Sequence, residues 1–135
     1  MFRLSWPESG GEPEYATFEG HRGLVALNHN SPAVLSCVAD VMRHWLARGA
    51  DGWRLGAAYA VPSRFRAGVV ARVRAKHPGA YLVGEVIHGN YAAAVTDTGL
   101  DTVTQYELWR IGCSPTAIAS GLGCPRSPRR PGTGR

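Results

Sequence analysis

Residues 51–58 read Asp51-Gly52-Trp53-Arg54-Leu55-Gly56-Ala57-Ala58 and contain the first buried strand that the sequence predicts. A short apolar run bounded by glycines is typical of such a strand, which we expect at residues 52–55. Residues two apart on a strand point to the same face, so Arg54 and Gly56 project together from its carboxyl end. A guanidinium there would keep a neighbouring carboxylate ionised, but glycine offers neither a charge nor a nucleophile.

The residues before this strand predict a helix. Ser31 is a suitable N-cap, Pro32 fits the first helical position, and Gly49 is a suitable C-cap. Apolar residues recur between these ends at helical spacing, at Val34, Leu35, Val38, Val41, Met42, Trp45 and Leu46.

A second helix is expected after the strand. Ser63 can cap it, and His77-Pro78-Gly79 ends it. One side of this helix is apolar, with Phe65, Val69, Val70 and Val73, and the other is basic, with Arg66, Arg72, Arg74 and Lys76. Further strands are predicted at residues 81–86 and 101–105, with a short helix at 90–97 between them.

Alternating helices and strands with short connections imply an α/β fold with parallel strands and right-handed crossovers. The pattern alone fits both an open doubly wound sheet and a segment of a barrel. Neither GxGxxG nor GxxxxGK[ST] is present, which weakens a dinucleotide-binding interpretation. Residues 1–23 are rich in Gly, Pro and Glu, and we expect them to be irregular loop that packs against another element.

Length and charge narrow the possible functions. The 135 residues suffice for one compact domain but not for a closed eight-stranded barrel, which needs about 250. The net charge is +5, but residues 112–135 contribute four arginines and no acid, so residues 1–111 carry only +1. A nearly neutral body argues against nucleic acid or a membrane surface as the partner.

The cysteines and tryptophans suggest no special chemistry. Cys37, Cys113 and Cys124 fit no paired zinc or redox motif, and we expect free thiols, with Cys37 buried on its helix. Trp45 and Trp53 are expected to pack in the core, whereas Trp109 could stack on a sugar. No transmembrane run or signal pattern is seen, so a soluble cytoplasmic protein is expected.

The last 24 residues differ from the rest of the chain. Residues 112–135 contain five glycines and four prolines, too many for a helix or a sheet, and we expect them to be disordered. Because GC-rich codons yield Gly, Ala, Pro and Arg, one hypothesis is that this tail is translated out of frame. The genomic reading frame would test that hypothesis.

The octapeptide at residues 51–58 resembles the strand-four motif of the alpha-amylase family of glycoside hydrolases, in which an Arg precedes a nucleophilic Asp by two residues. Leu82-Val83-Gly84-Glu85-Val86-Ile87-His88-Gly89 resembles the strand-five motif. The resemblance implies that Glu85 is the general acid and base, that Arg54 orients the nucleophile, and that Gly56 occupies the nucleophile position. It also implies that His88, similar to a His of neopullulanase-like members, lies near the sugar.

Two further segments extend the resemblance over about residues 1–110. Residues 24–34 look like the segment leading from the family's inserted loop domain into the helix before strand four, and residues 104–109 look like strand six of neopullulanase-type sequences. The implied architecture is a partial (β/α)8 TIM barrel holding strands four to six. Its expected parts are a loop-domain remnant at 1–30, a partial catalytic domain at 31–111 and the tail at 112–135.

The expected function is that of a fragment of a retaining alpha-glucosidic hydrolase, inactive because Gly56 replaces the nucleophilic Asp and because the strand-three and strand-seven motifs have no match. The ligand implied is an alpha-glucan or maltooligosaccharide, without a cofactor. Glu85 and His88 alone are too few to ligate a metal. Two alternatives stay open: a non-catalytic module that binds alpha-glucan or complements a half-barrel on another chain, and a self-standing doubly wound domain of unrelated function.

Overall fold

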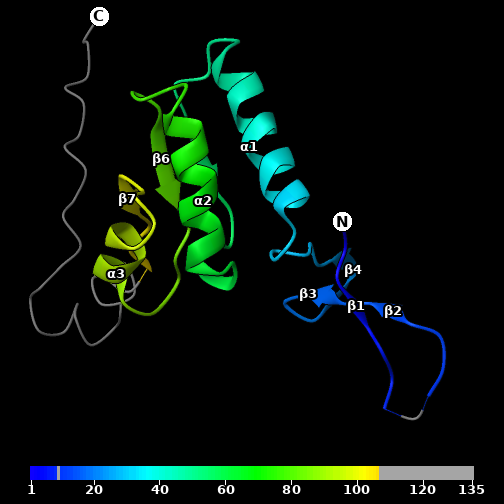
Figure 1. The fold of residues 1–135 in the computed structure, drawn as a ribbon. Coiled ribbons are helices and arrows are strands. Elements are labelled where there is room, and N and C mark those ends of the chain that lie inside the picture. Colours follow the sequence, from blue (N-terminus) through cyan, green and yellow to red (C-terminus); the bar gives the residue numbers. More distant parts are fainter. Residues whose placement is uncertain (9, 107–135) are drawn as a thin grey trace, which may run out of the picture.

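The structure is a computed structural model and describes residues 1–8 and 10–106. Its centre is a parallel sheet of three strands in the order β5 (Gly52–Leu55), β6 (Tyr81–Gly84) and β7 (Thr102–Val103) (Figure 1). The remaining elements of this part of the chain are α1 (Pro32–Leu46), the 3-10 helix η1 (Ala58–Ala60), α2 (Ser63–Arg74) and α3 (Tyr91–Thr96). The predicted α/β fold with parallel strands is confirmed.

The three strands of the described sheet follow one another in their order along the chain. In a doubly wound sheet the strand order reverses, and helices then cover both faces. Here β5, β6 and β7 follow one another without reversal, so right-handed crossovers place α2 and α3 on the same face. A segment of a barrel has this arrangement, and so does one half of a doubly wound sheet.

The hydrophobic core lies between the sheet and the helices. Leu82 of β6 and Val73 of α2 are fully buried, and α1 packs beside α2 (Figure 1). The four residues predicted for the apolar side of the second helix are all buried: Phe65, Val69, Val70 and Val73. Helical periodicity therefore identified the buried side of α2 correctly.

An ion pair connects α2 to the sheet. The Asp101 carboxylate accepts a hydrogen bond from the backbone N–H of Leu82 at 2.7 Å and another from Arg74 Nη2 at 2.8 Å. The Leu82 N–H, followed by the Arg74 guanidinium, holds the pKa of Asp101 below its usual range. Asp101 thus joins β6, α2 and the start of β7.

The N-terminal region contains more structure than expected. The prediction of irregular loop at residues 1–23 is wrong where short strands form two antiparallel pairs. The pairs are β1 (Leu4–Ser5) with β2 (Glu14–Tyr15), and β3 (Thr17–Phe18) with β4 (His21–Val25). Strands of two residues are too short to show an alternating pattern. The β3–β4 connection is Glu19-Gly20, and the positive φ of both residues is what a tight two-residue hairpin turn requires.

Several element ends differ from the sequence prediction. β6 ends at Gly84 rather than residue 86, β7 covers only residues 102–103, and α2 ends at Arg74 rather than near residue 77. Pro62, not Ser63, is the N-cap of α2, and Ser31 caps α1 by position without a side-chain hydrogen bond. The short helix predicted at 90–97 is present as α3, with the Asn90 side chain accepting from the Ala93 N–H.

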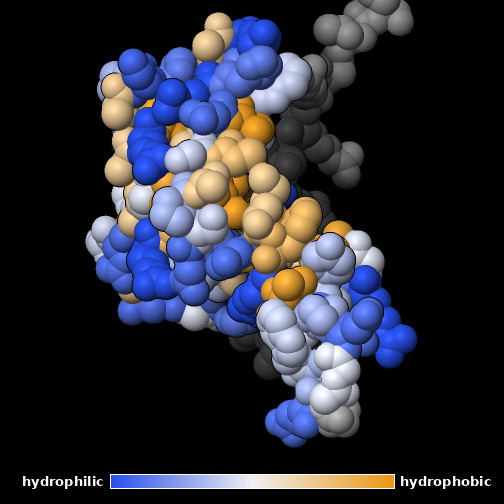
Figure 2. All heavy atoms as spheres, turned by 45° about the vertical axis from the view of Figure 1, so that its right-hand side comes forward, coloured by the Kyte–Doolittle hydropathy of each residue, from blue (hydrophilic) through white to orange (hydrophobic). Residues whose placement is uncertain are grey.

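One side of α1 is not covered by any described element. Cys37 is exposed, Val41 is 50% exposed and Trp45 is 52% exposed, so the prediction that Cys37 and Trp45 are buried is wrong. Trp53 is half-buried, and its indole N–H donates to the Met42 carbonyl at 3.2 Å. Figure 2 shows apolar atoms gathered in a band on this side of the molecule.

Some predictions concern residues outside the described ranges. Trp109, Cys113, Cys124 and the tail at 112–135 belong to this group, and the proposed domain boundaries stay predictions. None of the helices in the described ranges is long and apolar enough to cross a lipid bilayer.

Replacement of Gly52 by alanine should destabilise the fold. A Cβ at this position would lie 2.0 Å from the backbone oxygen of Tyr81, so β5 would have to move away from β6. We expect a loss of about 2 kcal/mol in the free energy of unfolding, measured by urea denaturation. Gly79→Ala is the control, because nothing lies within 4 Å of a Cβ there. Equal stability of the two variants would contradict the importance of this close approach.

Candidate functional site

The carboxyl ends of β5 and β6 bring Arg54 and Glu85 together. The parallel register pairs Arg54 with Val83 and Leu55 with Gly84, and Glu85 follows β6 directly. The Glu85 N–H donates to the Leu55 carbonyl at 2.8 Å, which continues the pairing by one residue. Because Leu82 points into the helix-covered core, strand alternation places Arg54, Val83 and Glu85 on the opposite face.

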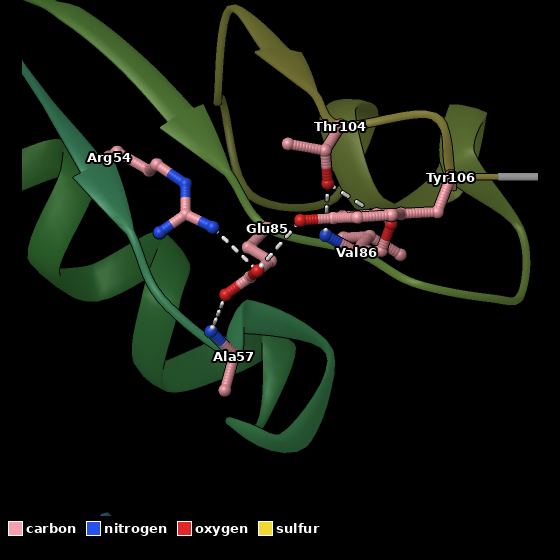
Figure 3. Close-up of polar contacts among 6 residues, drawn as sticks. All are labelled: Arg54, Ala57, Glu85, Val86, Thr104 and Tyr106. Carbon is pink, nitrogen blue, oxygen red and sulfur yellow. Dashed lines mark hydrogen bonds and ion pairs between the residues drawn. The ribbon is translucent and has the colours of Figure 1, made fainter. Parts of the chain in front are cut away.

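The Glu85 carboxylate is bound by donors from three segments (Figure 3). Arg54 Nη2 lies 2.5 Å and the Tyr106 hydroxyl 3.1 Å from Oε1, while the backbone N–H of Ala57 donates to Oε2 at 2.9 Å. The Glu85 side chain is 21% exposed and that of Arg54 56% exposed. Arg54 and Glu85 thus form an ion pair, and every one of these donors contacts the carboxylate itself.

These contacts favour the ionised form of Glu85. The Ala57 N–H, the Tyr106 hydroxyl and Arg54 lower the pKa of Glu85, and partial burial opposes them without reversing the direction. A carboxyl group whose pKa is lower in the folded than in the unfolded state stabilises the fold at neutral pH, and this contribution is lost as the pH falls through the folded-state pKa. At neutral pH Glu85 is therefore an anion and a hydrogen-bond acceptor.

Gly56 lies next to this carboxylate, and its backbone does not require glycine. A Cβ at Gly56 would have Glu85 Oε2 as its nearest neighbour, at an ordinary contact distance of 3.8 Å, and its φ lies outside the left-handed region. The left-handed residue of this turn is Ala57, with φ of 45°. A side chain at position 56 would thus fit beside Glu85.

His88 does not contact Glu85. It is exposed, and its ring lies 5.4 Å from the Tyr59 ring at an interplanar angle of 53°. Tyr59 lies beside both His88 and Glu85. Its ring faces the His88 ring, and its backbone N–H donates to the Glu85 carbonyl at 3.4 Å. Burial, followed by the charges of Glu19 and Glu85, raises the pKa of Tyr59, so its hydroxyl stays protonated.

Sequence reasoning did not identify Ala57 and Tyr106 as partners of Glu85. Tyr106 lies in the segment quoted as similar to strand six, but nothing in that segment indicated the contact. Its approach depends on Thr104, whose Oγ1 accepts from the Val86 N–H at 3.0 Å and donates to the Val86 carbonyl at 3.2 Å. Within residues 1–8 and 10–106, no group of three or more His, Cys, Asp or Glu is placed to hold a metal ion.

Comparison with known proteins finds similar enzymes both by sequence and by structure. No family model matches the sequence. It is 37% identical over 65 residues to neopullulanase 2 of Thermoactinomyces vulgaris, covering 48% of this chain and 11% of that protein. It is 34% identical over 79 residues to a cyclomaltodextrinase of a Bacillus species, covering 58% and 14%. The chain thus spans only a small part of these relatives.

A solved structure matches over a longer stretch. Cyclic alpha-maltosyl-(1→6)-maltose hydrolase from Arthrobacter globiformis, in complex with maltose, aligns with 82% of this chain and 26% of its own. The TM-score is 0.69 and the sequence identity 29%. The sheet and helices described above therefore have the fold of a part of that enzyme.

Tyr106→Phe should raise the pKa of Glu85, because the variant loses one hydrogen bond to the carboxylate while keeping the ring. The measurement is an NMR titration of the glutamate side-chain carboxyl carbons. Tyr81→Phe is the control, since Tyr81 is exposed on β6 and its hydroxyl does not contact Glu85. An unchanged Glu85 pKa in Tyr106→Phe would contradict the role assigned to this hydroxyl.

Proposed function

We propose that this chain, a homologue of the alpha-amylase family of glycoside hydrolases, is a catalytically defective relative of enzymes that hydrolyse alpha-glucosidic bonds with retention. In this proposal Glu85 occupies the position of the general acid and base, and Arg54 the position that orients the nucleophile. Gly56 occupies the position of the nucleophile itself. The observation that carries the proposal is the empty space beside Glu85 at this glycine.

Retaining hydrolysis needs two carboxyl groups about 5 to 5.5 Å apart. One attacks the anomeric carbon while the other protonates the departing oxygen, and the second then activates the water that releases the sugar. A carboxylate at position 56, whose Cβ would lie 3.8 Å from Glu85 Oε2, is compatible with that spacing. With glycine there, position 56 has no side-chain oxygen on which the covalent glycosyl intermediate could form.

The glycine at position 56 also affects Glu85, the other carboxyl group of the proposed pair. A general acid at neutral pH needs a raised pKa, and a nearby carboxylate provides part of that increase by charge repulsion. Glu85 instead has a lowered pKa, because its neighbours are hydrogen-bond donors and a guanidinium. In its present surroundings Glu85 is a poor proton donor, so both halves of the reaction are impaired.

Restoring the carboxylate should change the pKa of Glu85 without restoring activity. In Gly56→Asp we expect the pKa of Glu85 to rise, because a second carboxylate would lie beside it. We expect neither the natural sequence nor this variant to release nitrophenol from an aryl alpha-maltoside. The 135-residue sequence has no match to the strand-three and strand-seven motifs, the latter supplying the family's third carboxylate.

Gly56→Asn is the matched control for this variant, because it adds a side chain of the same shape without the charge. It should leave the pKa of Glu85 lower than Gly56→Asp does. Robust release of nitrophenol by the natural sequence or by Gly56→Asp would refute the proposal that the chain is catalytically defective.

A second candidate function is non-catalytic binding of alpha-glucan. It is favoured by the exposed His88 ring beside Tyr59 and by the likeness to a hydrolase whose structure contains maltose. A related possibility is complementation of a half-barrel on another polypeptide, favoured by the uncovered side of α1 and by the free edge of β5 within the described sheet.

Affinity electrophoresis tests whether the chain binds alpha-glucan. If the chain binds alpha-glucan, soluble starch in the gel should retard it relative to a gel without starch, because the bound polymer is nearly immobile. A gel containing dextran serves as the control for sieving by any polysaccharide. Unchanged migration in starch would rule out the binding function while leaving the proposed loss of catalysis intact.

A further inference from the structure

The exposed side of α1 carries an apolar stripe. Cys37, Val41 and Trp45 follow one another at intervals of four residues, so they lie along one line on the helix surface. All three are exposed, and no element in the described ranges covers them. They belong to the side of the molecule on which Figure 2 shows a band of apolar atoms. A contiguous exposed apolar surface of this kind is typical of an interaction site.

A cavity of about 380 Å³ lies beside this stripe, between α1, α2 and β5. Cys37 and Val41 of the stripe belong to its wall. Most of the remaining wall is apolar and comes from all three elements, including Val38, Met42, Trp53, Leu55, Phe65 and Val69. Because a cavity of about 150 Å³ already admits benzene, this one has room for the ring of a tryptophan. One face of the molecule thus has both an exposed aromatic side chain and a hollow that fits one.

A projection beside a hollow is an arrangement that two identical copies can satisfy together. In a two-fold interface, a contact of residue i with residue j is repeated as a contact of j with i. If two α1 helices pack antiparallel with Val41 on the two-fold axis, Trp45 of each copy lies opposite Cys37 of the other, since both are four residues from Val41. Cys37 is part of the cavity wall, so each tryptophan reaches the edge of the other copy's cavity.

The polar residues beside the stripe are complementary in the same arrangement. Asp40 and His44 line a hollow on α1 together with Cys37 and Val41. Arg48 Nη1 lies 2.8 Å from His44 Nδ1, and because a guanidinium only donates, the ring proton of His44 is on Nε2. In the antiparallel pair this N–H lies near Asp40 of the other copy and can donate to its carboxylate.

The available area sets the strength of such a dimer. With 15 residues, α1 is about 22 Å long and about 10 Å wide, so one face of it offers a contact on the order of 300 Å². An inserted tryptophan adds about 150 Å² or more. Stable interfaces bury about 800 Å² per partner. We therefore expect a weak dimer, with a Kd of about 10 to 100 µM.

We propose that the stripe formed by Cys37, Val41 and Trp45 is a self-association surface. A second copy of this chain packs its own α1 antiparallel on the stripe and places its Trp45 at the cavity between α1, α2 and β5. The inference goes beyond the proposed function, because it names a second copy as the occupant of the uncovered side of α1. It uses neither Glu85 nor Gly56, so its failure would leave the proposed loss of catalysis intact.

Sedimentation velocity of the full 135-residue chain tests the surface when the concentration is varied about tenfold to either side of the expected Kd. Val41→Glu should raise the Kd about tenfold or more, because two carboxylates would meet at the two-fold axis. Val25→Glu is the matched control, since this valine on β4 is 42% exposed and that on α1 is 50% exposed. Its Kd, and the thermal unfolding midpoints of both variants, should equal those of the natural sequence. An unchanged Kd in Val41→Glu, or oligomers larger than a dimer, would overturn the proposal.

Disulfide cross-linking tests the position of the two-fold axis. In a background with Cys37→Ser, Cys113→Ser and Cys124→Ser, Val41→Cys should give a linked dimer on oxidation with copper phenanthroline. At the axis the two Cα atoms come within the distance of about 7 Å that a disulfide spans. Ala47→Cys in the same background is the control, because this residue is exposed on another side of α1. No linkage at position 41, or equal linkage at position 47, would overturn the antiparallel arrangement.

Binding of anilinonaphthalene sulfonate identifies a different occupant if the natural sequence stays monomeric. A monomer that binds this dye, and binds it less after Val41→Glu, would show a surface open to a different polypeptide. A monomer that does not bind it would show that other residues of the same chain cover the stripe. Either result would overturn self-association.

Discussion

The parallel register of β5 and β6 is the constraint on which the rest of the structure depends. It requires the backbone of Gly52 to lie against the Tyr81 carbonyl, at a distance that no side chain at position 52 would permit. Once this register is set, the carboxyl ends of both strands coincide, and Arg54 reaches Glu85 across them. The placement of α2 beside α1 and the pairing with β7 follow from the same sheet.

At the carboxyl edge of this sheet, the residue at position 56 influences two properties at once. A carboxylate there would be a nucleophile, and it would also oppose ionisation of Glu85 by charge repulsion. With glycine, three donors, namely a backbone N–H, a phenol and a guanidinium, outweigh partial burial and favour the ionised form of Glu85. The site thus holds a single anion with satisfied hydrogen bonds, where the proposed function would have a pair of competing acids.

The sequence predicted the regular parts of this fold for identifiable reasons. The helical spacing of Phe65, Val69, Val70 and Val73 depends only on local geometry, so the buried side of α2 was correct. Strand alternation predicted that Arg54 and Gly56 share one face, and the parallel register of β5 and β6 then brings Glu85 to Arg54. Their catalytic roles, and the position of His88 near a sugar, stay proposals.

Features set by tertiary surroundings were less predictable. The exposure of Trp45 depends on which elements lie beside α1, and its position in an apolar stripe carries no such information. The contact of Tyr106 with Glu85 depends on how the segment after β7 is held by Thr104. The turn at Glu19-Gly20 joins β3, which has two residues, to β4, whose five residues are all exposed and so lack the alternation of a half-buried strand.

The hydrogen bonds of Glu85 have an evolutionary consequence. A residue that joins β5, the turn after it and the segment after β7 contributes to folding whether or not it takes part in a reaction. Under the proposed function, selection on folding alone would be sufficient to retain glutamate at position 85 without a nucleophile at position 56. The presence of Glu85 is therefore explained by its contacts at this sheet edge, whereas the residue at position 56 decides whether a second carboxylate lies beside it.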